Sequence, residues 1–325
     1  MKVFLTGGTG LLGANLAREL LKRGCGVKTL VRPSSDVSTL EGLELSFHEG
    51  DLLTSDALLS GMEGCTYVIH AAANTDVWPT YSQAQWDANV KGTQNMIQAA
   101  LKTGVSRFIH VSTANVFGFG SLVKPGNEQS PFLSGKYKLG YIDSKYAAQQ
   151  RVEQAIKELG LPAIMINPTF MIGPYDSKPS SGAMVKGIME EGLPGYPAGG
   201  KNFVAVKDVA TATVNALQMG SIGESYILGN ENLSFRQAFQ LMANVAGVKP
   251  PSIPLPPLAT KLYGRIGSIL GSVSGQAPKV SYPTARIACD GHYFDPSKAR
   301  KEIGLTPTPI STAIQEAVQW FRRRE

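Results

Sequence analysis

The fold is decided by residues 2–13, Lys2-Val3-Phe4-Leu5-Thr6-Gly7-Gly8-Thr9-Gly10-Leu11-Leu12-Gly13. The apolar run 3–5 predicts a short buried β-strand, and 7–13 predicts a tight turn that opens a helix running to about Arg23. Two glycine patterns overlap in the turn, G-x-G-x-x-G at Gly8, Gly10 and Gly13, and G-x-x-G-x-x-G when Gly7 replaces Gly8.

Each glycine of this turn has a physical role. The first ones permit a sharp strand-to-helix turn, the middle one lets the backbone approach a pyrophosphate, and Gly13 lets the helix pack closely on the strand. Because the turn follows a strand and precedes a helix, a dinucleotide site is favoured over a structural turn. We expect the cofactor to meet Gly7, Thr9, Gly10, Leu11, Leu12 and Gly13.

The composition is that of a globular chain with room for about two domains. Of 325 residues, 43% are hydrophobic and 17% charged, which excludes a disordered chain. The net charge of +6 is mild, and the basic run 322–324 is typical of a solvated helix end. We therefore expect no nucleic-acid partner.

The three cysteines and four histidines form no disulfide or metal-binding pattern. No apolar run of about 18 residues predicts a spanning helix, and no signal peptide is expected before the first strand. These features predict a cytoplasmic protein without a metal site.

The second strand, 27–31, is followed by Arg32, Pro33, Ser34 and Ser35. In dinucleotide folds this position meets the adenosine ribose, and an acidic residue there favours NAD. A guanidinium with two hydroxyls suits a 2′-phosphate instead, so we predict NADP(H). The alternative is that Arg32 is a solvated loop residue.

Further strands, at 45–48, 67–70 and 108–111, alternate with helices, which predicts an α/β fold with a doubly wound parallel sheet. Ligands of such sheets sit at the carboxyl ends of the strands. There, Asp51-Leu52 could meet the adenine, or Asp51 could cap the helix that starts near Ser55. The small residues Ala71-Ala72-Ala73 could let a cofactor lie against the backbone, or could pack a helix.

Tyr141 and Lys145 are four residues apart and face one side of a predicted helix that runs to about Leu159. A neighbouring ammonium favours the phenolate of a tyrosine, so Tyr141 is a candidate proton donor to a carbonyl oxygen. The fifth strand ends in Ser112-Thr113, which offers a hydroxyl to the same oxygen. The alternative to a catalytic role is that Tyr141 and Lys145 are an exposed pair of side chains on the surface of a helix.

Together these motifs resemble the extended short-chain dehydrogenase/reductase family, over the first 175 residues. The resemblance implies that Tyr141 is the acid/base and that Lys145 holds the nicotinamide ribose and lowers the tyrosine pKa. It points to Thr113 rather than Ser112 as the catalytic hydroxyl, while Asn89 either orders the site or supports the sheet. The matching segments are Thr6–Gly13, Asp51-Leu52, His70–Ala73, Asn89–Thr93, Val111–Gly118, Tyr141–Lys145 and Asn167–Pro174.

The segment Asn167–Pro174 is similar to that of dihydroflavonol reductases and cinnamoyl-CoA reductases, whose backbone near Pro168 to Met171, with Phe170, would meet the nicotinamide. Asp208–Ala210 and His292–Arg300 resemble the same reductases and the 3β-hydroxysteroid dehydrogenases. The residues around Tyr141, Lys138-Leu139-Gly140, depart from the plant reductases, so no flavonoid substrate is implied.

The second half predicts a substrate lobe. We assign 1–170 and 202–232 to the NADP-binding part, and 171–201 and 233–325 to a smaller, mostly helical lobe. Predicted elements are helices 182–191, 209–219, 235–246 and 312–324, and strands 203–206 and 226–228. The stretch 250–279 contains an apolar helical stripe, formed by Leu262, Ile266, Ile269, Leu270 and Val273. The favoured interpretation is that this stripe packs within the lobe. A lid over a hydrophobic substrate is the functional alternative, and a membrane-surface patch is a weaker one.

The predicted function is an NADP(H)-dependent oxidoreductase acting on a carbonyl or alcohol of a small hydrophobic molecule. A homodimer is left open. The alternative is a nucleotide-sugar epimerase or dehydratase with tightly bound NAD, for which Arg236, Arg265 and Arg286 could clamp a diphosphate. A third interpretation, a non-catalytic NADP sensor, is disfavoured by the intact hydroxyl, tyrosine and lysine set.

Overall fold

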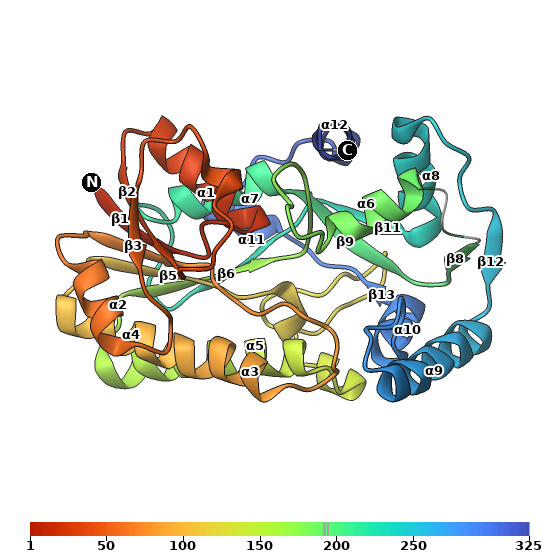
Figure 1. Cartoon of the computed structure of the whole chain (residues 1–325), viewed down its shortest axis with the longest axis horizontal. Coiled ribbons are helices and arrows are strands. Elements are labelled where there is room, and N and C mark those ends of the chain that lie inside the picture. Colours follow the sequence, from red (N-terminus) through yellow and green to blue (C-terminus); the bar gives the residue numbers. More distant parts are fainter. Residues whose placement is uncertain (191–192, 194, 325) are drawn as a thin grey trace.

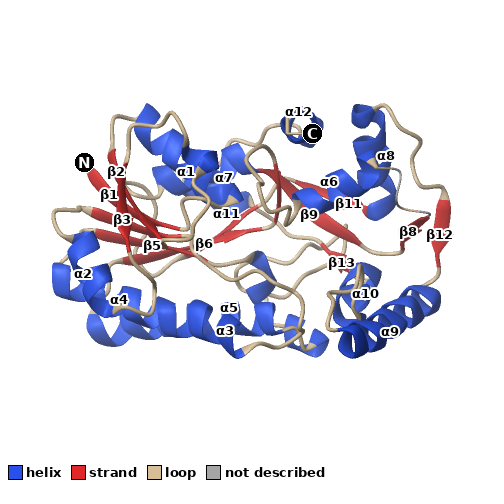
Figure 2. Cartoon of the chain, in the orientation of Figure 1, coloured by secondary structure: helices blue, strands red, loops and turns tan. Residues whose placement is uncertain are grey.

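The computed structural model describes residues 1–190, 193 and 195–324, and its centre is a seven-stranded sheet in the order β10-β6-β5-β4-β1-β2-β3 (Figures 1 and 2). Every pairing within it is parallel. This confirms the predicted fold class. Its strands are β1 (Lys2–Thr6), β2 (Gly26–Val31), β3 (Ser46–Glu49), β4 (Tyr67–His70), β5 (Arg107–Val111), β6 (Ala163–Pro168) and β10 (Ser225–Leu228).

Helices cover both faces of this sheet, because its strands bury apolar side chains on both sides. In β1, Val3 and Leu5 join the core beneath α1 (Leu11–Lys22) and α7 (Val206–Asn215). Phe4 points the other way, into the core beneath α2 (Ser55–Met62), α4 (Gly92–Thr103) and α5 (Gly140–Leu159). Figure 1 shows these two helical layers above and below the sheet.

The helical stretch 83–103 contains a turn of π-helix. Its pieces are α3 (Gln83–Trp86), the π segment η2 (Asp87–Lys91) and α4. Single π turns often occur at functional sites, and this one carries Asn89.

A second, four-stranded sheet is built from β7 (Phe170–Ile172), β9 (Gly200–Ala205), β11 (Glu231–Ser234) and β13 (Gly291–His292). With α6 (Gly182–Met189), α8 (Phe235–Ala246) and α12 (Ile310–Arg322) it encloses a separate apolar core. A two-stranded pair, β8 (Gly195–Pro197) and β12 (Ile253–Leu255), also belongs to this half, whereas α11 (Ser297–Glu302) packs on β10 of the seven-stranded sheet. The boundaries that we assign to the substrate lobe stay a proposal.

Several bounds predicted for the second half of the chain differ from the structure, including α12, which runs from Ile310 to Arg322 instead of 312–324. The strand expected at 203–206 is β9, which ends at Ala205 because Val206 already begins α7, so the helix expected at 209–219 is also shifted. The helix expected at 182–191 ends at Met189, and its predicted last residue, Glu191, lies outside the described residues.

The stretch 250–279 forms α9 (Pro257–Ser274), which packs against α10 (Tyr282–Cys289). The prediction that its apolar stripe packs inside the lobe is wrong. Leu262, Ile266, Ile269, Leu270 and Val273 are all exposed, because the helix turns its small residues inward instead.

No helix within the described ranges combines the length and the apolar character that crossing a bilayer requires.

The first testable prediction concerns the glycine turn. A Cβ on Gly13 would lie 1.9 Å from the Gly7 carbonyl oxygen, so Gly13→Ala must displace backbone. We expect its free energy of unfolding to fall by about 2 kcal/mol, the usual cost of overpacking. Gly187→Ala is the matched control, because this glycine of α6 has no atom within 4 Å of its Cβ position. Equal urea midpoints for the two variants would contradict the steric argument.

Candidate active site

The side chains of Thr113 and Tyr141 meet at the carboxyl edge of the seven-stranded sheet. Thr113 follows the end of β5 by two residues, and Tyr141 stands in the first turn of α5. The Thr113 hydroxyl lies close enough to the Tyr141 phenol to act on its pKa. The structure therefore brings together the hydroxyl and the phenol that the sequence placed 28 residues apart.

Ser112 lies differently. Its Oγ is buried and has no hydrogen-bond partner among the described residues. Thr113 Oγ1 instead accepts the Asn115 N–H over 3.3 Å and faces Tyr141. Of the two predicted hydroxyls, only Thr113 is placed beside the phenol.

Burial raises the pKa of Tyr141 to about 12, although the neighbouring Thr113 hydroxyl acts in the lowering direction. The net shift is upward, so the lowering of the tyrosine pKa by Lys145 stays a prediction. The phenol is consequently protonated at neutral pH, which is the form that can donate a proton.

Lys145 is almost completely buried, at 4% exposure, and its Nζ donates to the Val111 carbonyl over 2.7 Å. Burial lowers the pKa of its ammonium to about 8. The hydrogen bond ties α5 to the end of β5, one helical turn beyond Tyr141, so it fixes the position of the helix that carries the phenol.

Asn89 supports the same helix through its side-chain amide. Nδ2 donates to Ser144 Oγ over 2.9 Å, and Ser144 Oγ in turn donates to the Tyr141 carbonyl. The Asn89 amide also bonds both the N–H and the carbonyl of Asn74. Its contacts are with backbone and Ser144, so the structure places it behind Tyr141 rather than beside the phenol oxygen.

The glycine turn is held from below by buried polar groups. Thr6 Oγ1 bonds His70 Nδ1 over 2.8 Å, and His70 Nε2 bonds Thr93 Oγ1 over 3.0 Å. Burial lowers the pKa of His70 to about 3, so the ring is neutral and can link two hydroxyls. This network joins β1, β4 and α4 beneath the turn.

The turn itself leaves a site for a dinucleotide. Gly7 has φ +74° and lies against Ala72, where a Cβ would come within 2.6 Å of the backbone nitrogen. A Cβ on Gly10 would make only an ordinary contact, 3.5 Å from the Gly7 carbonyl oxygen, and this glycine is exposed. No side chain caps α1, so the N–H groups of Leu11, Leu12 and Gly13 are available to a phosphate.

Arg32 is exposed just beyond β2, and its guanidinium makes no hydrogen bond or ion pair with any residue of the described ranges. Its backbone is ordered by Ser35, whose Oγ accepts the Arg32 N–H over 3.1 Å. Thr39 Oγ1 donates to the Thr9 carbonyl and attaches this loop to the glycine turn. A cation without a protein partner thus stands beside the dinucleotide turn.

The remaining cofactor candidates also lie at this edge. Asp51 Oδ1 accepts the Leu53 N–H over 2.9 Å, which orders the turn before α2, while Leu52 packs on Gly92 of α4. Ala71, Ala72 and Ala73 follow β4 and are half-buried. Ala72 N–H donates to Thr6 Oγ1, so this segment lies against the glycine turn.

Pro168 ends β6 and Phe170 begins β7, so the segment expected at the nicotinamide end joins the two sheets. Sequence reasoning missed the side chain that lies over it. Lys201 Nζ is 5.1 Å from the centre of the Phe170 ring, and burial lowers the pKa of Lys201 to about 8. No described carboxylate lies within 4 Å of this ammonium. Lys201 precedes the strand predicted at 203–206, so no sequence signal placed it beside Phe170.

A second missed group joins distant parts of the chain. Tyr137 donates its hydroxyl to Asp290 Oδ2 over 2.5 Å and lies 3.0 Å from His292 Nε2. Phe119 stacks on the His292 ring at 4.1 Å. The partners are more than 150 residues apart, so no local spacing reveals them.

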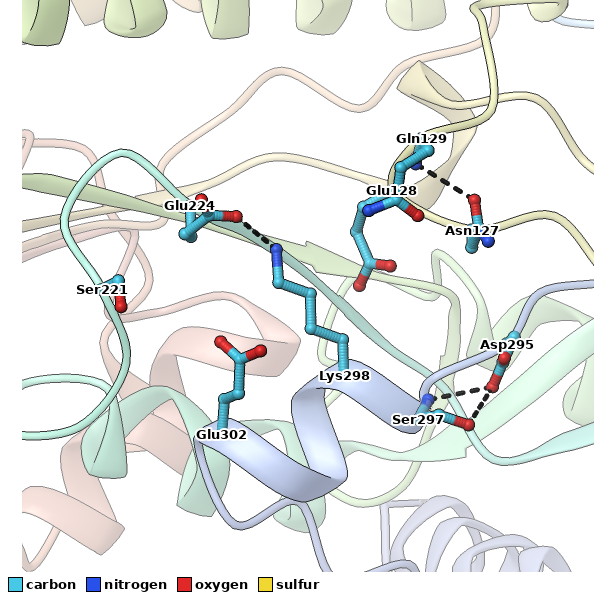
Figure 3. Close-up of a pocket in the computed structure, with 9 residues that line it drawn as sticks. All are labelled: Asn127, Glu128, Gln129, Ser221, Glu224, Asp295, Ser297, Lys298 and Glu302. Atoms are coloured by element: carbon cyan, nitrogen blue, oxygen red, sulfur yellow. Dashed lines mark hydrogen bonds and ion pairs between the residues drawn. The ribbon is translucent and has the colours of Figure 1, made fainter.

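Figure 3 shows a hollow of about 580 Å³ that is a junction between segments rather than the site. Its charged side chains already have partners. Lys298 pairs with Glu224, Glu302 accepts the Tyr226 hydroxyl, and Glu128 accepts the Ile227 N–H. It contains none of the predicted site residues.

Comparison with known proteins agrees with this geometry. A family model described as "NAD dependent epimerase/dehydratase family" matches residues 3–229. The chain belongs to this family. It is therefore an enzyme of the extended short-chain dehydrogenase/reductase class and binds a nicotinamide dinucleotide.

Three relatives span nearly the whole chain. A "putative dihydroflavonol 4-reductase" of Synechocystis sp. is 33% identical over 98% of this chain and 94% of its own. "Sterol demethylase protein B" of Methylococcus capsulatus is 31% identical over 100% and 99%. The crystal structure of gox2253 superposes with a TM-score of 0.87 and 36% identity, covering 99% of this chain and 98% of that one. The predicted family resemblance is confirmed.

The second testable prediction follows from the buried Lys145. Its folded pKa of about 8 lies below the usual value of 10.5. Between pH 8 and pH 10.5 the lysine is protonated more fully in the unfolded chain than in the folded one, so the free energy of unfolding rises with pH. The buried lysine therefore destabilises the fold most below pH 8, and this destabilisation decreases as the pH rises. The advantage of Lys145→Met over wild type should therefore shrink by about 2 kcal/mol between pH 7 and 9.5.

This difference is measured by urea unfolding of both proteins at the two pH values. Lys157→Met, at an exposed position of the same helix, is the control and should show no such change. A pH-independent difference between Lys145→Met and wild type would contradict a depressed lysine pKa.

Proposed function

We propose that the protein is an NADP(H)-dependent reductase of a carbonyl group on a hydrophobic small molecule. The observation that carries the proposal is that Thr113, at the end of β5, faces a half-buried, protonated Tyr141 at the start of α5. A hydroxyl and an acidic proton that converge on one point suit a carbonyl oxygen, which gains negative charge during reduction.

The chain's own groups then have distinct roles. Thr113 holds the substrate oxygen, Tyr141 donates its proton to that oxygen, and Lys145 positions α5 and contacts the nicotinamide ribose. When bound, the reduced nicotinamide supplies the hydride to the carbonyl carbon. Asn89 acts as a positioning residue, through Ser144 and the Tyr141 carbonyl.

The cofactor is NADPH in this proposal, because Arg32 is exposed beside the glycine turn without a protein partner. A 2′-phosphate would supply the anion that a guanidinium binds well. The uncapped N-terminus of α1 supports binding of the pyrophosphate.

A hydrophobic substrate is supported by the names of two relatives, which refer to a dihydroflavonol and a sterol. The epimerase alternative needs a cationic clamp for a diphosphate. Arg265 and Arg286 both lie over the Tyr282 ring, whereas Arg236 is on α8, which Figure 1 shows apart from α10. The three arginines therefore offer no joint clamp. Lys201, over Phe170, offers one cation to a polar end of the substrate.

The reaction class is tested with the purified protein. Bound nucleotide is released and identified, and NADPH absorbance is followed with aromatic and aliphatic aldehydes and ketones, beside UDP- and dTDP-sugars. We expect stoichiometric NADPH oxidation with hydrophobic carbonyls and none with the sugars. Tightly held NAD and interconversion of a nucleotide sugar without net redox would overturn the reductase proposal.

The third testable prediction separates the site hydroxyls. Tyr141→Phe removes the proton donor and Thr113→Val removes its partner, so each should lower kcat by about 10²-fold or more. Ser112→Ala should retain near wild-type turnover, because Ser112 Oγ has no partner in the described part of the chain. Cofactor dissociation constants should change little in all three. A fully active Tyr141→Phe enzyme would remove the phenol from the mechanism.

The fourth testable prediction concerns Arg32. Arg32→Asp removes a charge-assisted contact and adds repulsion, so NADPH should bind at least 10-fold more weakly while NADH binding changes little. Arg151→Asp, at an exposed position on α5, is the charge-matched control. Fluorescence titration of both cofactors measures the effect, and wild-type protein that binds NADH more tightly than NADPH would refute the assignment.

A further inference from the structure

Helix α9 buries small residues and exposes its large apolar side chains. Thr260, Gly264 and Gly271 are its buried residues and lie on one side of the helix. A Cβ on Gly264 would come within 2.4 Å of Ala285 Cβ in α10, and one on Gly271 within 2.9 Å of the Trp78 ring. Small residues thus let α9 approach α10 and the loop around Trp78 closely, and the guanidinium of Arg265 lies over the Tyr282 ring at the edge of this contact.

The opposite side of α9 is apolar and open to solvent. Leu258 is 80% exposed, Leu270 62% and Val273 83%. Spacings of three and four residues place these on one face. The exposed large side chains of this face are Leu258, Leu262, Tyr263, Ile266, Ile269, Leu270 and Val273. A contiguous apolar face of this kind on a soluble chain marks an interaction surface.

The surrounding sequence carries charge of one sign. All 25 acidic residues lie outside 232–289, whereas that segment contains six basic residues: Arg236, Lys249, Lys261, Arg265, Lys279 and Arg286. Lys261 and Arg265 are four residues apart and border the apolar face of α9. An apolar face bordered by cations, with no nearby acid in the sequence, complements an anionic lipid surface.

This face is connected to the candidate active site through one loop. Trp78 of that loop packs on Gly271 of α9, and the carbonyl of Thr80 accepts the Gly140 N–H over 2.7 Å. Gly140 directly precedes Tyr141. A surface that contacts lipid at α9 is therefore one loop away from the residue that we propose as the proton donor.

We propose that α9 seats the protein on a bilayer that contains anionic lipids, with the helix in the plane of the interface. Its apolar side chains enter the boundary between headgroups and acyl chains, and Lys261 and Arg265 meet lipid phosphates. This goes beyond the reductase proposal and does not depend on it, because none of these side chains belongs to the candidate active site.

Vesicle flotation of the full chain tests the proposal. Vesicles of phosphatidylcholine alone are compared with vesicles of phosphatidylcholine and phosphatidylglycerol at low and high salt. We expect binding that is at least 10-fold tighter to the anionic vesicles and weaker at high salt, because the electrostatic part is screened.

Two sets of variants assign the binding to α9. The triple variant Leu262→Gln, Ile266→Gln, Leu270→Gln should lose at least 10-fold in affinity, while the double control Leu159→Gln, Ile222→Gln, at similarly exposed positions, should bind as wild type. Lys261→Gln with Arg265→Gln should abolish the preference for anionic vesicles, whereas Lys102→Gln with Lys157→Gln, also exposed, should keep it.

The triple variant should keep its thermal midpoint and its turnover of a water-soluble carbonyl, since it alters only exposed positions outside the site. Wild-type protein that binds neither vesicle, or a triple variant that binds as well as wild type, overturns the proposal. A wild-type dimer that the triple variant converts to monomer in sedimentation, without vesicle binding, assigns the face to a second copy of the chain and equally overturns it.

Discussion

The hydrogen bond from Lys145 to the Val111 carbonyl is the constraint on which the candidate site depends. It joins the middle of α5 to the end of β5, so the first turn of α5 must lie beside the residues that follow β5. Tyr141 is one turn before Lys145 and Thr113 is two residues after Val111, so both side chains reach the same point. Burial of the lysine disfavours its charged form and so destabilises the fold. In return, the contact fixes the position of the first turn of α5.

At the glycine turn after β1, close backbone packing rather than charged side chains shapes the proposed dinucleotide site. Gly7 and Gly13 remove the Cβ atoms that would separate β1, β4 and α1, and the neutral His70 ring holds the turn through Thr6. The result is a set of free N–H groups at the start of α1, an arrangement that favours an anion without a buried cation. Arg32 then adds a positive charge only at the exposed margin of this site, where we propose that it favours NADP(H) over NAD(H).

The sequence predicted those parts of the structure that depend on local spacing. The parallel sheet, the glycine turn and the Tyr141–Lys145 pair all follow from periodicity or from positions three or four residues apart. The raised pKa of Tyr141 did not follow, because it depends on burial by residues distant in the chain. The Tyr137–Asp290 hydrogen bond was not predicted for the same reason, since its two partners come from different halves of the chain.

The apolar stripe of α9 shows why the spacing of apolar residues alone led to a wrong prediction of where the stripe packs. A period of 3.6 residues identifies a helix with one apolar face, but it does not say whether that face meets protein. The information lay in the opposite face, where Gly264 and Gly271 allow an approach that larger residues would forbid. Because that close packing also holds the loop carrying Thr80 against Gly140, the same glycines that turn the apolar side chains outward help to set the start of α5. The exposed face of α9 and the helix that carries Tyr141 are thus positioned by one continuous set of contacts, from Gly271 through Trp78 and Thr80 to Gly140.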